Sequence, residues 1–160
     1  MIRLARADDN TAIAAIWNLE AVGTIATTDT EARTPDGQAA WLAAHTEDHP
    51  AVVAVDGDDV VAFGSLWPYR MKPSYRRTVE DSVYVKDGYR GKGFGSDVLA
   101  ELLAHARARG HRSVIARVTS ENAGSLRLHR RHGFERAGYE RQVAFKLDRW
   151  LDVVTLQLLL

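Results

Sequence analysis

The feature that most constrains this chain is a set of three glycines at alternate positions: Gly91, Gly93 and Gly95. They follow a β-branched run that ends at Val85 and precede an apolar stripe with helical spacing, so they join a strand to a helix. Glycine permits positive φ and close backbone approach, so successive N–H groups can point outward at the start of that helix. Together with the helix dipole and the charges of Arg90 and Lys92, this arrangement favours phosphate binding over a plain flexible turn.

The glycine spacing excludes two other phosphate-binding loops. A P-loop requires Gly-x-x-x-x-Gly-Lys-Ser/Thr, and the chain contains no such run. A dinucleotide fingerprint places its third glycine three residues after the second, whereas here the interval is shorter.

Hydrophobic periodicity around the loop predicts the order β-α-α-β-β-β-α-β-α-β-β. Strands are expected at 2–6, 51–55, 60–67, 78–85 and 113–118, with two more between 134 and 158. Helices are expected after Asp9, from Pro35 behind the N-cap Thr34, from Phe94 to Gly110, and over 122–132. This order predicts an α/β (α+β) architecture around a mixed sheet.

Length and composition narrow the class of protein further. The 160 residues predict a single domain over 1–160, and the formal net charge of zero argues against a nucleic-acid partner. No cysteine is present, which removes thiolate nucleophiles, and the five histidines other than His129 form no i,i+4 pair with a carboxylate ligand set that suggests a metal. Neither a signal peptide nor a membrane span is indicated, so we expect a cytoplasmic protein without a membrane partner.

Charge is distributed unevenly along the chain. Residues 1–60 carry a balance of −8 and residues 61–160 a balance of +8. The basic part could attract a small polyanionic ligand, or the two parts could pair across the fold or a subunit contact; the composition leaves both open.

The segment 90–95 resembles the Arg/Gln-x-x-Gly-x-Gly/Ala pyrophosphate signature of the GNAT acetyltransferase superfamily, and Asn122 to Phe134 resembles its second block. The resemblance implies a GNAT fold, with a mostly antiparallel central sheet flanked by helices on both faces, and acetyl-CoA as co-substrate. It further implies a bulged strand that splays at 83–85 and frees N–H groups for the thioester. The residues it assigns to acetyl-CoA are Val83, Tyr84, Val85, Arg90, Gly91, Lys92, Gly93, Phe94, Gly95, Ser96, Asn122 and Ser125.

A narrower resemblance covers almost the whole chain. The segments 27–31, 34–35, 75–85 and 149–153 are similar to the phosphinothricin and methionine sulfoximine acetyltransferases. This implies acetyl transfer to the α-amine of a small amino acid by direct attack in a ternary complex. It also implies a homodimer with each site near the subunit interface.

Glu80 is the candidate general base, because an ammonium cannot attack a thioester until it loses a proton. On a strand, Glu80, Ser82 and Tyr84 share one face, and a carboxylate within a sheet layer is unfavourable unless it is used or paired. An ion pair with a neighbouring arginine is the alternative interpretation.

Two residues of the later helix have more than one interpretation. The resemblance makes His129 a candidate proton donor to the leaving thiolate, with Tyr84 or solvent as competitors and a plain packed histidine as the alternative. Asn122 matches a residue that contacts acetyl-CoA, and it is also a suitable helix N-cap.

Substrate contacts are expected from the basic loop before Glu80, where a guanidinium suits a carboxylate or phosphinate. The candidates are Arg70, Tyr75, Arg76 and Thr28. Thr28 stands where the narrower family often has phenylalanine, which affects side-chain preference. Other acceptors (a protein N-terminus or a polyamine) and a non-catalytic acyl-CoA-binding module are the alternative functions.

Overall fold

The computed structural model describes residues 1–160. Its strands are β1 (Ile2–Leu4), β2 (Ala51–Asp56), β3 (Asp59–Pro68), β4 (Thr78–Val85), β5 (Ser113–Thr119), β6 (Glu135–Lys146) and β7 (Arg149–Leu159). Its helices are α1 (Asn10–Gly23), α2 (Pro35–Ala43), α3 (Phe94–Ala108) and α4 (Ala123–Arg131), with short 3₁₀ turns η1 (Ala7–Asp9) and η2 (Pro73–Tyr75). The order along the chain confirms the prediction from periodicity.

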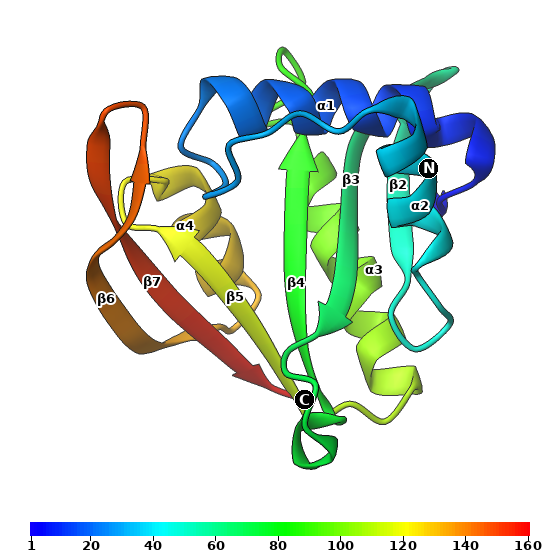
Figure 1. Cartoon of the computed structure of the whole chain (residues 1–160). Coiled ribbons are helices and arrows are strands. Elements are labelled where there is room, and N and C mark those ends of the chain that lie inside the picture. The colour runs from blue at the N-terminus through cyan, green and yellow to red at the C-terminus, as the bar shows by residue number, and fades with distance from the viewer.

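All seven strands belong to one sheet, in the order β1-β2-β3-β4-β5-β7-β6 (Figure 1). Only the β4–β5 pair is parallel, because α3 crosses over between these strands; every other neighbouring pair is antiparallel. The predicted mixed, mostly antiparallel sheet is therefore confirmed.

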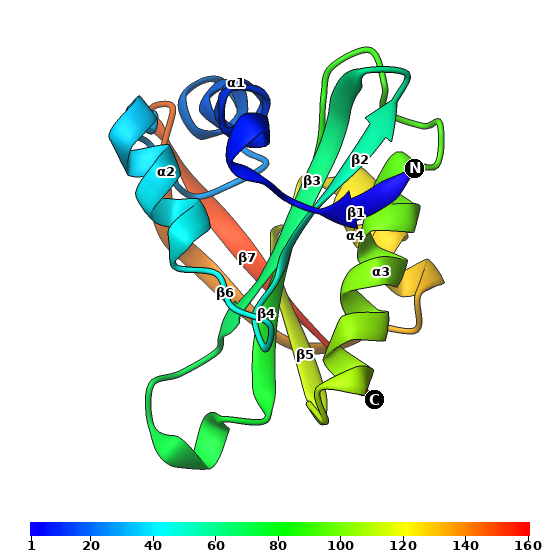
Figure 2. The ribbon, with the colours of Figure 1, turned by 90° about the vertical axis from the view of Figure 1, so that its right-hand side faces the viewer.

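Helices cover both faces of the sheet, with α1 and α2 on one side and α3 and α4 on the other (Figure 2). The larger apolar core lies under α3 and includes Leu99, Leu102 and Leu156; the smaller one lies under α1 and includes Ile13 and Phe63. No helix combines the length and the apolar character needed to span a bilayer.

Close packing of α3 on the sheet depends on Gly64 in β3. A Cβ at this position would lie 2.6 Å from Cγ1 of Val98 and 2.7 Å from the carbonyl oxygen of Ser82. Because the second of these atoms belongs to the neighbouring strand's backbone, the clash could not be relieved by a side-chain rotation.

The central pair of strands separates halfway along its length. β4 and β5 pair only from Thr78 with Ser113 to Glu80 with Ile115, and beyond this point they diverge (Figure 1). The expected splay at 83–85 is thus present. The expected bulge is absent, because β4 keeps an unbroken register with β3; divergence from β5 alone leaves the edge of residues 83–85 without a strand partner.

Candidate active site

The glycine loop presents free N–H groups at the start of α3. Gly91 and Gly93 have φ values of 78° and 97°, in the region that side-chain-bearing residues rarely adopt. The main-chain N–H groups of Gly91, Lys92 and Gly93 donate no hydrogen bond within the chain. Gly95 serves packing, because a Cβ there would come 3.2 Å from Cγ2 of Val85. The unpaired N–H groups and the helix dipole fit a pyrophosphate.

A groove of about 810 Å³ extends from this loop between β4 and α4; we call it the glycine-loop groove. Ten of the twelve residues expected to contact acetyl-CoA line it: Val83, Tyr84, Val85, Arg90, Gly91, Gly93, Gly95, Ser96, Asn122 and Ser125. Lys92 and Phe94 do not. The Lys92 ammonium lies 4.7 Å from the ring centroid of Tyr89, and Phe94 packs against the core under α3.

Arg90 is held in place by a buried carboxylate. Its guanidinium forms an ion pair with Glu20 of α1, whose side chain is almost fully buried. The second oxygen of Glu20 accepts a hydrogen bond of 2.6 Å from Oγ1 of Thr24. The ion pair therefore holds Arg90 at the wall of the groove, while about half of its side chain, 54%, stays exposed.

Asn122 caps α4 and also lines the glycine-loop groove, so its contact to acetyl-CoA stays a prediction. Its Oδ1 accepts a 3.1 Å hydrogen bond from the N–H of Ser125, which caps α4, and both residues line the glycine-loop groove. A cap and a contact to a bound ligand are compatible at this position.

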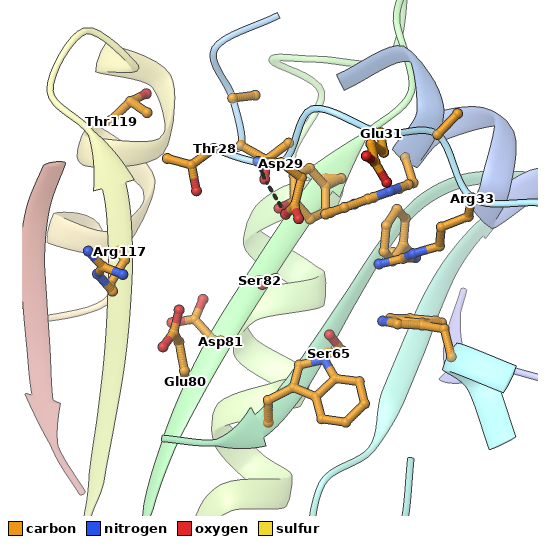
Figure 3. A pocket seen from close by; sticks show the side chains of 18 of the residues that line it. Thr28, Asp29, Glu31, Arg33, Ser65, Glu80, Asp81, Ser82, Arg117 and Thr119 are labelled. Atoms are coloured by element: carbon orange, nitrogen blue, oxygen red, sulfur yellow. Dashed lines mark hydrogen bonds between the residues drawn. The ribbon is translucent and has the colours of Figure 1, made fainter. Parts of the chain in front are cut away.

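A second hollow, of about 510 Å³, lies on the α1 side of β4; we call it the Glu80 hollow (Figure 3). Aromatic side chains form much of its wall: Trp17, Trp41, Phe63, Trp67 and Tyr84. Glu80 and Ser82 project from β4, with Arg117 of β5 on one side and Arg33 on the other (Figure 3). The shared face of Glu80, Ser82 and Tyr84 is thus the floor of this hollow.

The Glu80 carboxylate has no hydrogen-bond or ion-pair partner in the chain, although Arg117 and Arg70 are near enough to act on it electrostatically. Burial raises the pKa of Glu80, the adjacent charge of Asp81 adds to this effect, and the charges of Arg117 and Arg70 oppose it. A half-buried carboxylate with a raised pKa and no structural partner is typical of a general base.

Tyr84 and Ala26 line both the groove and the hollow, so the two spaces meet at these residues. The Tyr84 ring stacks on Phe63 at 5.2 Å and meets Trp17 edge-on at 5.3 Å. Burial raises the pKa of Tyr84 to about 12, so its hydroxyl stays protonated at neutral pH.

His129 lies on the opposite face of β4 and lines neither space. Its Nε2 is 2.9 Å from Oδ2 of Asp81, its Nδ1 is 2.8 Å from the Ser125 carbonyl oxygen, and only 3% of the residue is exposed. Burial disfavours the charged ring, but the hydrogen bond and charge of Asp81 outweigh it and raise the pKa of His129. In this position His129 joins α4 to β4, and its proposed proton transfer stays a prediction.

The residues expected to bind substrate separate into two groups. Thr28 lines the Glu80 hollow, whereas Arg70, Tyr75 and Arg76 are exposed in the loop between β3 and β4 and do not line it. Of these three, only Arg70 is near enough for its charge to lower the pKa of Glu80.

Sequence reasoning missed the two arginines that do line the hollow. Arg33 lies between the rings of Trp17 and Trp41, 4.0 and 4.5 Å from their centroids, and burial lowers its pKa to about 10. Nothing in the sequence marked it, because it precedes an ordinary helix N-cap. Arg117 had a signal: it is the single charge within the buried strand β5.

Comparisons with known proteins agree with this geometry. Residues 11–134 match the model of the acetyltransferase (GNAT) family. The chain is 41% identical to an L-methionine sulfoximine/L-methionine sulfone acetyltransferase of Pseudomonas paraeruginosa, over 98% of this chain and 92% of the relative.

Solved structures share the fold over the whole chain. A phosphinothricin acetyltransferase of Sinorhizobium meliloti in complex with acetyl-CoA is 33% identical, with a TM-score of 0.96 over 100% of this chain and 88% of that one. A ribosomal-protein-alanine N-acetyltransferase of Brucella melitensis is 37% identical, with a TM-score of 0.96 over 100% and 99% of the two chains. With its glycine loop, splayed strand and unpaired carboxylate, the chain belongs to the acetyltransferase (GNAT) family.

Proposed function

We propose that the whole chain, residues 1–160, acts as one N-acetyltransferase domain that acetylates the α-amine of a small amino acid of the methionine sulfoximine, methionine sulfone or phosphinothricin type. One observation carries the proposal: an unpaired carboxylate, Glu80, lies at the floor of a hollow that meets the glycine-loop groove at Ala26 and Tyr84. An amine in the hollow would thus lie beside an acetyl group delivered through the groove.

Glu80 acts as the general base in this proposal. Bound acetyl-CoA supplies a thioester carbonyl as the electrophile. The carboxylate removes a proton from the substrate ammonium, directly or through a water molecule, and its raised pKa improves its match to an amine. Because the chain has no cysteine, direct attack of the amine is the simplest route.

Two features of β4 serve the remaining steps. The unpaired edge at 83–85 offers main-chain N–H groups to the charge that develops on the carbonyl oxygen; removal of one such donor typically costs about 3–4 kcal/mol of barrier. Tyr84 is protonated at neutral pH and lines both spaces, and this position supports it as the donor to the leaving thiolate in preference to His129, which lines neither.

The acceptor is proposed to bind with its apolar stem against the aromatic wall and its charged groups at the arginines of the hollow. Arg117 would bind the α-carboxylate, because it lies on the same side as Glu80 (Figure 3), and in doing so it would exchange its 2.7 Å ion pair with Glu140 for the substrate. Arg70, Tyr75 and Arg76 do not line the hollow and remain predicted contacts, and Thr28 in place of phenylalanine leaves more room in the wall.

We propose that the protein works in the cytoplasm as a homodimer. Four large apolar side chains gather near the β6–β7 turn and are 45–58% exposed: Val143, Phe145, Leu147 and Trp150. The rings of Phe145 and Trp150 meet at 5.3 Å and form an apolar surface that a second copy would cover. Light scattering on Trp150→Glu tests this: a monomer is expected, and an unchanged dimer would place the interface elsewhere.

A panel of acceptors in a free-thiol assay tests the substrate class. Methionine sulfoximine, methionine sulfone and phosphinothricin should release CoA thiol with acetyl-CoA, and mass spectrometry should show a single added acetyl group. One solved relative is named as acting on a ribosomal protein, so the panel includes an alanine-ended peptide and spermidine. Activity on the peptide alone would reject the amino acid assignment.

A further inference from the structure

The wall between the two spaces is formed by residues 24–29, which we call the partition segment. Thr24, Ile25 and Ala26 line the glycine-loop groove, and Ala26, Thr27, Thr28 and Asp29 line the Glu80 hollow. The main chain of this segment therefore crosses from one space to the other at the point where the amine and the thioester would meet.

A buried lysine from the other end of the chain holds this segment. Lys146, the last residue of β6, is only 4% exposed. Its Nζ donates a 2.8 Å hydrogen bond to the carbonyl oxygen of Thr27 and a 3.1 Å hydrogen bond to that of Glu20. Both partners are main-chain atoms, and one ammonium thus joins the end of α1 to the partition segment.

This arrangement is unfavourable for stability taken alone. Lys146 has no ion-pair partner within 4.0 Å, and a buried charge without a counter-ion is costly. Burial lowers the pKa of Lys146, while the more distant charges of Asp29 and Glu20 oppose that effect. The presence of Lys146 is therefore better explained by the main-chain groups that it fixes than by a contribution to the free energy of unfolding.

A second side chain of the C-terminal half fixes the same segment. Oγ1 of Thr119, at the end of β5, donates a 2.7 Å hydrogen bond to the carbonyl oxygen of Ile25. Ile25 and Thr27 are thus held on either side of Ala26, the residue shared by both spaces. Two donors, one on the carbonyl group of Ile25 and one on that of Thr27, thus hold the main chain on both sides of the junction.

We propose that Lys146 is a positioning residue for acetyl transfer, which fixes the partition segment so that the amine, rather than water, reaches the thioester. This inference rests on the proposed acetyltransferase activity. Lys146 touches neither space itself; it acts through the carbonyl groups of Glu20 and Thr27. Loosening the segment would open the junction to solvent and misplace the acceptor at the same time.

The test is Lys146→Met, which keeps an unbranched apolar stem one atom shorter than that of lysine and removes both hydrogen bonds. The measurement is the ratio of CoA thiol released to acetylated amino acid formed, with phosphinothricin and methionine sulfone as acceptors. Wild type should give a ratio of one. In the variant, acetyl transfer should fall about 10- to 100-fold, as a displacement of about 1 Å can cause, while hydrolysis persists and the ratio rises well above one.

Three further variants complete the experiment. Lys146→Arg retains donors for both carbonyl groups and should bring the ratio back towards one. Arg141→Met removes an exposed cation from the same strand and should behave as wild type. Thr119→Val deletes the second hydrogen bond almost isosterically, so it should also raise the ratio and keeps the test open if Lys146→Met does not fold.

The outcomes separate the inference from the proposed function. A ratio of one in folded Lys146→Met and in Thr119→Val, whatever their rates, overturns the positioning role. A wild type that forms no acetylated amino acid rejects the proposed function instead. Thermal denaturation of Lys146→Met should show a Tm close to wild type, because loss of the buried charge offsets loss of the two hydrogen bonds.

Discussion

Replacing Glu80 by glutamine should abolish most activity and stabilise the protein at neutral pH. Glutamine keeps the shape of the side chain and cannot accept a proton at neutral pH. Loss of a general base typically lowers rates about 10²- to 10⁴-fold, so we expect kcat to fall by this factor. Binding of acetyl-CoA should change little, because Glu80 does not line the glycine-loop groove.

The stability effect follows from the raised pKa of Glu80. A carboxyl with a higher pKa in the folded state contributes stability that is full below its unfolded pKa of about 4.3 and is lost as pH rises through the folded pKa. At neutral pH the half-buried, unpaired carboxylate therefore destabilises the wild type relative to glutamine. A charged group in this setting costs about 1 kcal/mol, which corresponds to roughly 2–4 °C in Tm for a chain of this size.

Two measurements check these expectations. Steady-state kinetics should show kcat/KM of wild type rising with pH through the raised pKa of Glu80, and this limb should disappear in Glu80→Gln. Arg117→Met removes a charge that lowers this pKa and should move the limb to higher pH. Calorimetry at pH 7 and pH 4 should show the gain in Tm at pH 7 only. An unchanged kcat, or equal gains at both pH values, would refute the reasoning.

Three other changes test the frame around the site. Gly64→Ala should lower the free energy of unfolding by about 1–3 kcal/mol in urea denaturation, because the new Cβ meets the Ser82 carbonyl oxygen at 2.7 Å; a wild-type midpoint would contradict this. Gly93→Leu should weaken CoA binding in calorimetry, since φ is 97° and a Cβ would crowd the phosphates; unaltered affinity would count against the loop. The pKa of His129 is raised, so its pairing with Asp81 contributes stability that is full below pH about 6.5 and is lost as pH rises through the folded pKa. Asp81→Asn should remove this pH dependence of the free energy of unfolding. An unchanged pH dependence in the variant would contradict the role of the pair.

The order of strands and helices could be predicted from the sequence because it depends on local signals. Alternation in 78–85, helical spacing after Phe94 and the Pro35 start of α2 each act within a few residues. The phosphate loop is equally local: three glycines before a helix need no distant partner to define their backbone conformation. A carboxylate in a strand otherwise rich in β-branched residues contradicts the pattern, which marks Glu80 and Asp81 alike; the alternation of the strand places Glu80 on the face of Ser82 and Tyr84.

Contacts between distant segments decided the rest. Whether Arg70 or Arg117 lies beside an acceptor depends on the residue at which β5 stops pairing with β4. No sequence pattern in either strand predicts that residue. The burial of His129 against Asp81, and the reach of Lys146 to Thr27 across most of the chain, arise only when the helices dock on the sheet. Local sequence determines backbone conformation through sterics and periodicity, whereas the neighbours of a long polar side chain are set by packing between elements that the sequence alone does not bring together.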